Sequence, residues 1–160
     1  MTRILAIDPG SNEVGLYWGP GQSTTLYLTD MSLSKSKRAK TPRSHRLGIL
    51  ARKLDGYLRY IQPDFVVYEE QFVRGGAATK ALFGAVGVIE AAAFQVNAGV
   101  MSVPQSTLRK WAAARATEAQ ATPKRLYAWV ARSFDVTPKT EHELDACVLW
   151  HFIQEQGEVG

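Results

Sequence analysis

The chain has 160 residues, of which 46% are hydrophobic, and it carries a net charge of +4. This length and apolar content predict one folded domain over residues 1–160. The most apolar window, residues 81–96, contains Glu90 and is too short to span a bilayer, which argues against a membrane-spanning segment. The single cysteine, Cys147, excludes an internal disulfide and a cysteine-based zinc site, and it favours a reducing cytoplasm.

The first 28 residues have the pattern of three short antiparallel strands. Residues 4–7 form an apolar run that ends at Asp8, and the following Pro9-Gly10 is a turn signature. Residues 13–18 predict the second strand, and residues 24–28 predict the third. An aspartate in this place can be a turn residue or an acid that holds a cation, and the stretch alone leaves both interpretations open.

A basic segment follows the predicted strands. No acid occurs between Asp30 and Asp55. The positive residues of this interval are Lys35, Lys37, Arg38, Lys40, Arg43, Arg46, Arg52 and Lys53. Such a segment is typical of proteins that bind phosphate backbones, although a solvated loop that keeps the protein soluble has the same composition. We expect residues 34–40 to be a loop, and Thr41-Pro42 to begin a helix that ends just before Pro63.

Strands and helices alternate in the remaining sequence. Residues 65–68 predict a buried strand that ends at Glu69-Glu70, and residues 77–96 predict a helix rich in small residues. That helix is either buried in the core or the seam of a homodimer, with Gly84 and Gly87 at the seam. A strand at 100–103, a helix through 111–114, a helix starting at 123 and a helix at 141–155 complete the chain.

Acidic residues occur where an α/β sheet would bring them together. Asp8 and Glu69 or Glu70 end two apolar strands, while His142 and Asp145 are three residues apart on one face of the last helix. Clustered carboxylates repel each other unless a divalent cation lies among them, and such oxygen-rich sites suit Mg²⁺ or Mn²⁺. Two such ions commonly serve the hydrolysis of a phosphodiester. Each acid could instead be an ordinary surface charge.

Three blocks of the sequence resemble the RuvC-like Holliday junction resolvases of the ribonuclease-H-like nuclease superfamily. IDPGSNEVGLYW resembles the opening strand pair that carries the first catalytic aspartate of that family. QPDFVVYEEQF resembles the strand that carries its catalytic glutamate, and HELDACVLW resembles the last helix with two metal-site residues. The order and spacing of the blocks match over nearly the whole chain, and a phage-type member, active in the host cytoplasm, would fit this compact form.

The resemblance implies an α/β fold of the ribonuclease-H-like type. Its five-stranded mixed sheet would have three antiparallel and two parallel strands, with helices on both faces. It assigns catalysis and metal binding to Asp8, Glu69, His142 and Asp145, and it selects Glu69 over Glu70. The candidate DNA-binding residues are Phe72, Lys35, Lys37, Arg38, Lys40, Arg43, Arg109, Lys110 and Lys124. Among these, Phe72 would stack on a nucleobase, unless it is a core residue.

The implied activity is symmetric nicking of branched DNA, with four-way junctions as the substrate, by a homodimer. The implied cofactor is Mg²⁺, two ions per site, with Mn²⁺ as a substitute. The sequence departs from the family pattern at His142, where many members have aspartate, which predicts a stronger preference for Mn²⁺ or a steeper pH dependence. It departs again at ARATEAQATP, before Lys124. A helicase partner and a cleavage sequence are not indicated.

Three other functions are compatible with parts of the pattern. A ribonuclease-H-like nuclease that processes structured RNA would use the same acids. A non-catalytic junction-binding protein would keep the basic segment and never cut. A phosphotransferase of the actin and sugar-kinase class also opens with an Asp-x-Gly turn, but it needs a second copy of the fold, for which 160 residues are too few.

Overall fold

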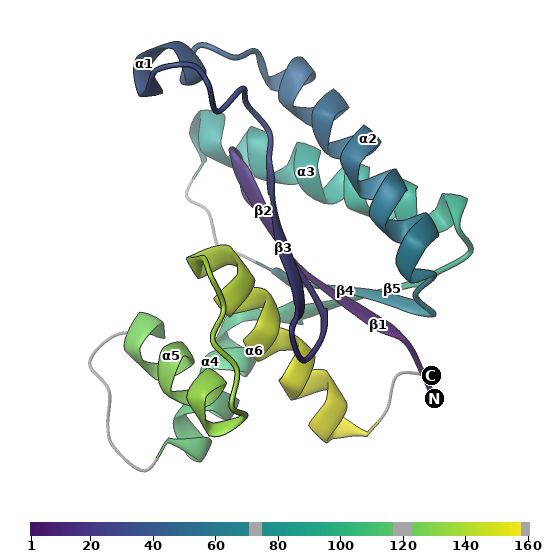
Figure 1. The fold of residues 1–160 in the computed structure, drawn as a ribbon, viewed down its shortest axis with the longest axis vertical. Coiled ribbons are helices and arrows are strands. Elements are labelled where there is room, and N and C mark those ends of the chain that lie inside the picture. The colour runs from purple at the N-terminus through teal and green to yellow at the C-terminus, as the bar shows by residue number, and fades with distance from the viewer. Residues whose placement is uncertain (71–74, 117–122, 158–160) are drawn as a thin grey trace.

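A five-stranded mixed sheet forms the centre of the fold (Figure 1). The computed structural model describes residues 1–70, 75–116 and 123–157. The strands are β1 (Ile4–Asp8), β2 (Glu13–Gly19), β3 (Gln22–Tyr27), β4 (Phe65–Glu70) and β5 (Gly99–Pro104). In the sheet order β3-β2-β1-β4-β5, β2 is antiparallel to β1 and β3, and β4 is parallel to β1 and β5. This topology confirms the predicted mixed sheet.

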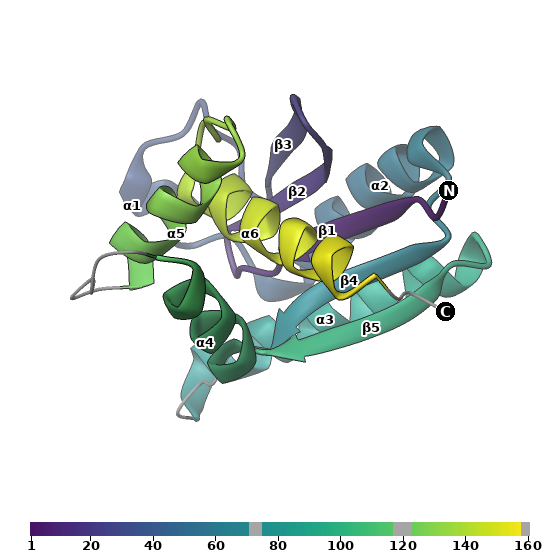
Figure 2. The ribbon, with the colours of Figure 1, turned by 90° about the horizontal axis from the view of Figure 1, so that it is seen from below.

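Helices cover both faces of the sheet, as the sequence predicted (Figures 1 and 2). They are α1 (Lys35–Arg38), α2 (Arg43–Ile61), α3 (Gly76–Gln95), α4 (Gln105–Arg115), α5 (Pro123–Ser133) and α6 (Glu141–Gln156). The α2 and α3 helices pack on one face, and α4, α5 and α6 pack on the other. Within the described residues, no helix is long and apolar enough to cross a membrane.

The alternation of β1 explains why this strand is apolar throughout. Ile4 and Ala6 face the core under α4 to α6, whereas Leu5 and Ile7 face the core under α2 and α3. A strand covered on both faces needs apolar side chains at every position, and β1 meets this need until Asp8. Asp8, at the end of β1, is the first polar side chain of the strand, and it is still buried.

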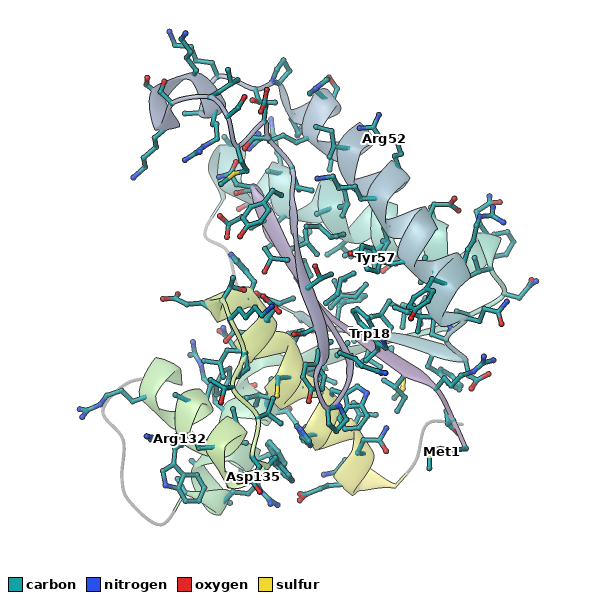
Figure 3. All side chains as sticks on the ribbon, viewed as in Figure 1. Met1, Trp18, Arg52, Tyr57, Arg132 and Asp135 are labelled. Carbon is teal, nitrogen blue, oxygen red and sulfur yellow. The ribbon has the colours of Figure 1, made fainter. Side chains whose placement is uncertain are left out.

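The ends of α2 follow the sequence signals. Its first residue comes directly after Thr41-Pro42, and it ends before Pro63, where Gln62 adopts a left-handed conformation with φ of 49°. Aromatic packing joins α2 to the sheet, because the rings of Trp18 and Tyr57 lie 5.8 Å apart between their centroids (Figure 3). The expected loop at 34–40 is partly wrong. Residues 35–38 form the single-turn helix α1, whose first turn is capped by the hydroxyl of Ser34.

The small residues of α3 have a role inside the chain. A Cβ atom added to Gly84 would lie 2.9 Å from Cδ1 of Leu47, so this glycine allows α2 and α3 to approach closely. A Cβ atom added to Gly87 would meet open space. Gly84 thus serves an internal helix contact, and the homodimer seam stays a prediction.

Candidate active site

Two buried carboxylates lie at the ends of neighbouring parallel strands. Ile7 of β1 pairs with Tyr68 of β4, which places Asp8 and Glu69 side by side at the next position. Their residues are 2% and 4% exposed, respectively. Because side chains alternate along a strand, Asp8 and Glu69 point towards α6, as Ala6 does. Charged groups are rarely buried so completely without a partner or a function.

Alternation also separates Glu69 from its neighbour Glu70. Glu70 is exposed and accepts a hydrogen bond from the Ser102 hydroxyl of β5. It points to the opposite face of β4, away from Asp8. The geometry therefore favours Glu69 as the residue of the site, as the family resemblance implied.

Close contact with β2 brings the first turn of α6 to these carboxylates. A Cβ atom on Gly15 would lie 2.1 Å from the carbonyl oxygen of His142, so only glycine allows α6 to rest on the strand backbone. The Nδ1 atom of His142 donates a hydrogen bond of 2.6 Å to Oδ2 of Asp8. Its Nε2 atom lies 3.6 Å from Oε2 of Glu13. Asp145 follows one turn later on the same helix face.

The acids of this cluster raise each other's pKa values. Burial and the charge of Asp8 raise the pKa of Glu69 to about 7, while Gln105 and Arg109 act in the opposite direction. Burial, followed by the charges of Asp8 and Glu69, raises the pKa of Asp145 well above its ordinary value. The hydrogen bond to Asp8 raises the pKa of His142. Near neutral pH, this cluster holds protons that exposed acids would have lost.

A small cavity of about 130 Å³ lies over the acids. It is lined by Glu69, Gln105, Arg109, Tyr127, Glu141, Leu144 and Asp145. We call it the acid cavity. Oε1 of Glu69 and the hydroxyl of Tyr127 are buried and have no hydrogen-bond partner among the described residues. Buried polar atoms are normally paired, so these two oxygens are suited to a ligand.

The donor atoms of this cluster are of the chemical type that hard divalent cations prefer. Asp8, Glu69 and Asp145 offer carboxylate oxygens, which Mg²⁺ and Mn²⁺ prefer, and Oε1 of Glu69 is unpaired. However, the part of the chain that the structure describes contains no three His, Cys, Asp or Glu residues arranged to hold a metal ion. Oδ2 of Asp8 is instead engaged by His142. The predicted ligands therefore lie near one another, but in this structure they are not arranged around one metal position.

The predicted DNA-binding residues fall into different places. Arg109 lines the acid cavity, whereas Lys110 is exposed on the same helix and does not line it. Phe72 and the side chain of Lys124 lie outside the described part of the chain. The exposed basic residues at the start of the helical region are Lys35, Lys37, Lys40 and Arg43, with Arg38 partly buried.

The basic segment adjoins the turn that follows Asp8. Lys35 and Arg38 line a cavity of about 220 Å³ together with Asn12 and Glu13. The guanidinium of Arg46 donates to the carbonyl of Ser11 and to Oδ1 of Asn12, at 3.2 and 3.0 Å. Arg46, which belongs to the basic segment, therefore holds this turn.

Sequence reasoning missed Glu143. This residue is 3% exposed. It accepts hydrogen bonds from the hydroxyls of Ser23, Thr25 and Thr140, at 2.6, 2.9 and 3.1 Å. These hydroxyls tie β3 to the start of α6, beside His142. The signal that could have found Glu143 is the capping-box spacing of Thr140 and Glu143, and the Glu143 amide does donate to the Thr140 hydroxyl.

No protein-family model matches the sequence, and a search of curated protein sequences finds no significant match. Solved structures do match. RuvC of Thermus thermophilus, in complex with a Holliday junction substrate, has a TM-score of 0.72 at 20% identity, over 98% of this chain and 97% of that chain. The chain has the RuvC-like fold.

Two further Holliday junction resolvases share this RuvC-like, ribonuclease-H-like fold. The yeast mitochondrial resolvase Ydc2 has a TM-score of 0.58 at 10% identity, over 91% of this chain and 75% of that chain. Fowlpox virus resolvase, in complex with Holliday junction DNA, has a TM-score of 0.51 at 11% identity, over 96% and 99%. The predicted fold class is therefore confirmed over nearly the full length of the chain.

Proposed function

We propose that this chain is a metal-dependent endonuclease that nicks branched DNA, with four-way junctions as its substrate. The main support is the meeting of Asp8, Glu69 and Asp145 where β1, β4 and α6 converge, in a RuvC-like fold. Acids buried at neighbouring strand ends, with raised pKa values, are typical of functional sites. Two of the similar solved structures are themselves complexes with Holliday junction DNA.

Mg²⁺ is the cofactor that this proposal requires, with Mn²⁺ as a substitute and two ions per site. Asp8, Glu69 and Asp145 would hold it, together with His142 once the imidazole releases Oδ2 of Asp8. When bound, the divalent cation supplies the positive charge that activates water and stabilises the phosphorane-like transition state. Arg109, at the wall of the acid cavity, would bind the scissile phosphate.

The basic segment and the oligomeric state complete the proposal. Lys35, Lys37, Lys40 and Arg43 would bind junction phosphates, because these residues are exposed and Lys35 lines a cavity together with Asn12 of the turn after Asp8. Symmetric nicking needs two active sites, so we propose a two-fold homodimer. The products would carry 5′-phosphate and 3′-hydroxyl ends, and the whole of residues 1–160 would act as one nuclease domain.

A nicking assay tests the proposal. A synthetic four-way junction and a linear duplex of matched sequence are incubated with Mg²⁺ and either the wild type or Asp8→Asn. We expect paired nicks in the junction, little cutting of the duplex, and no cutting by the variant. Equal cutting by both proteins, or none by either, would contradict the proposal.

The same assay separates the alternative functions. Equal cleavage of structured RNA and junction DNA would indicate a ribonuclease-H-like nuclease of broader or RNA specificity. Junction binding that is equal with and without metal, and never followed by nicking, would indicate a binding protein.

A further inference from the structure

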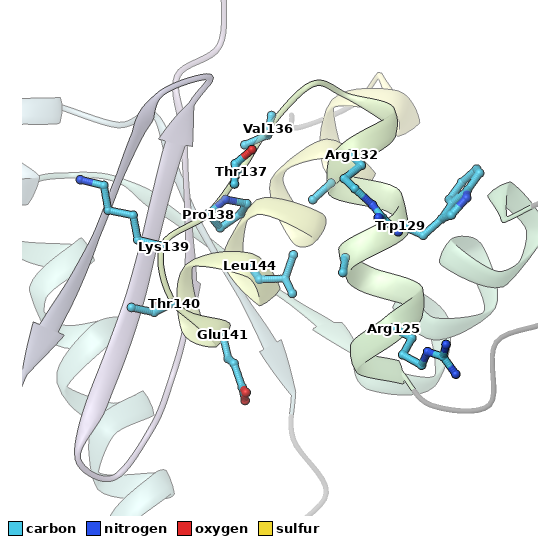
Figure 4. A pocket seen from close by; sticks show the side chains of 12 residues that line it. Arg125, Trp129, Arg132, Val136, Thr137, Pro138, Lys139, Thr140, Glu141 and Leu144 are labelled. Carbon is cyan, nitrogen blue, oxygen red and sulfur yellow. The ribbon is translucent and has the colours of Figure 1, made fainter.

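A larger groove lies beside the acid cavity. It has a volume of about 630 Å³ and separates α5 from residues 136–141 (Figure 4). We call it the α5–α6 groove. Ala128, Val136 and Leu144 give it an apolar lining. Glu141 and Leu144 line both the groove and the acid cavity, so the two spaces adjoin.

The charge of the groove is opposite to that of the acid cavity. Three cations, Arg125, Arg132 and Lys139, line the groove against one acid, Glu141. Arg132 belongs to α5, and Lys139 belongs to the segment on the other side of the groove, where its side chain points away from α5 (Figure 4). Both side chains belong to exposed residues. Trp129 also lines the groove, and its indole points away from residues 136–141 (Figure 4).

We propose that the α5–α6 groove binds the stretch of DNA strand next to the scissile phosphate. Arg132 and Lys139 would bind its phosphates, and the apolar lining would face bases that open at the branch point. This inference rests on the proposed function and adds the path of the substrate.

Electrostatics support this assignment. A cluster of buried acids repels a polyanion, so a strand that reaches Asp8 and Glu69 needs cations close by. Positively charged grooves that follow the backbone are the general device for binding single strands. The α5–α6 groove is cationic, is open to solvent at Arg132 and Lys139, and is continuous with the acid cavity. It lies on the α4-to-α6 face, whereas the basic segment precedes and enters α2 on the other face.

Salt dependence of binding tests the groove. The double variant Arg132→Ala/Lys139→Ala is compared with Arg3→Ala/Arg59→Ala, which removes the same charge at exposed positions paired with Asp64 and Asp55. Binding of a fluorescent four-way junction is measured by anisotropy between 50 and 200 mM salt, with Ca²⁺ in place of Mg²⁺. Loss of two phosphate contacts should reduce the slope of log K against log salt by about 1.4–1.8.

Nicking kinetics give a second readout. We expect the groove double variant to raise KM by roughly tenfold with kcat nearly unchanged, because its residues bind DNA without touching the reacting atoms. The control double variant should keep both constants. Since wild-type nicking tests the proposed function by itself, failure of the groove is distinguishable from failure of the nuclease.

Crosslinking locates the strand directly. Thr137 is exposed and lines the groove, and the natural Cys147 is buried, so Thr137→Cys can carry a photoreactive maleimide at one position. We expect crosslinks to nucleotides within a few residues of the nick, and few from Arg59→Cys on α2. The inference is wrong if the wild type nicks junctions while the groove variants equal the control variants in three respects. These are the slope of log K against log salt, the KM and the crosslinking pattern. Crosslinks spread evenly over all strands would also overturn it.

Discussion

At the scale of single residues, the contact between Asp8 and His142 would control how the proposed site accepts a cation. Oδ2 of Asp8 accepts the Nδ1 proton of His142, and Glu69 has a pKa of about 7. A divalent cation binds the deprotonated carboxylates and neutral imidazole, so its binding must displace these protons.

Metal binding should therefore release protons. Mg²⁺ or Mn²⁺ is titrated into the protein at pH 7 by calorimetry, in two buffers with different ionisation enthalpies. We expect the observed enthalpy to depend on the buffer and the affinity to fall as the pH drops from 8 to 6. A buffer-independent enthalpy together with a flat affinity would contradict the assigned protonation states.

The same pKa shifts predict that the metal-free protein loses stability as the pH rises. The carboxyl pKa values of Glu69 and Asp145 are raised in the folded state, so folded protein binds more protons than unfolded protein. Stability is then greatest below the ordinary carboxyl pKa and is lost as the pH rises through about 7 and above. His151 has its pKa lowered to about 4 by burial and acts oppositely only below pH 6.5.

Asp145→Asn should relieve this loss. In chelator, between pH 6.5 and 8.5, we expect the Tm of the wild type to fall more than that of the variant. At pH 8.5 the variant should be more stable by at least about 1 kcal/mol, since one pKa unit corresponds to 1.36 kcal/mol. It should not nick DNA. Asp55→Asn, in an exposed ion pair, serves as the control and should follow the wild type. Parallel Tm curves for all three proteins would refute the predicted repulsion.

At the scale of elements, the placement of α6 decides whether the site exists. Gly15 allows the helix to touch β2, and Glu143 fastens its first turn to β3 through the hydroxyls of Ser23 and Thr25. His142 and Asp145 are carried by that turn and the next. Any shift of α6 should therefore change metal binding as well as stability.

Glu143→Gln tests this coupling. The amide replaces an acceptor oxygen with a donor, which leaves buried hydroxyls mismatched and should cost about 1–3 kcal/mol of unfolding free energy. We also expect weaker metal binding, because α6 is displaced. Glu90→Gln is the control: Glu90 accepts from the Tyr68 hydroxyl, and an amide oxygen can do the same. Metal affinity equal to wild type in a destabilised Glu143→Gln protein would show that Glu143 does not position the site.

The sequence predicts elements well where the signal is local. The Pro9-Gly10 turn and the signals Thr41-Pro42 and Pro63 at the two ends of α2 act on residues next to them in the sequence. Sequence-based prediction fails where an interaction joins residues that are far apart in the sequence. Ser23 and Glu143 are 120 residues apart, and Arg46 reaches a carbonyl 35 residues away. The sequence alone left Glu69 and Glu70 equivalent, and the family resemblance or the strand register was needed to separate them.

At the scale of the whole molecule, the RuvC-like sheet gathers acids at one edge and leaves cations on either side of them. The acid cavity lies where β1 and β4 end, the basic segment adjoins the turn after Asp8, and the α5–α6 groove adjoins the cavity on the other side. A branched polyanion could contact both cationic regions while one phosphate lies over the acids.

The most direct test of the account compares two neighbouring residues of β4. Single-turnover nicking of a four-way junction with Mg²⁺ is measured for the wild type, Glu69→Gln and Glu70→Gln. Only Glu69 faces Asp8 and the acid cavity, and Glu70 bonds to Ser102 on the opposite face. We predict a loss of about 10²–10³-fold or more for Glu69→Gln and a change within a few fold for Glu70→Gln. Equal rates for the two variants, or a wild type that leaves the junction uncut, would contradict the account.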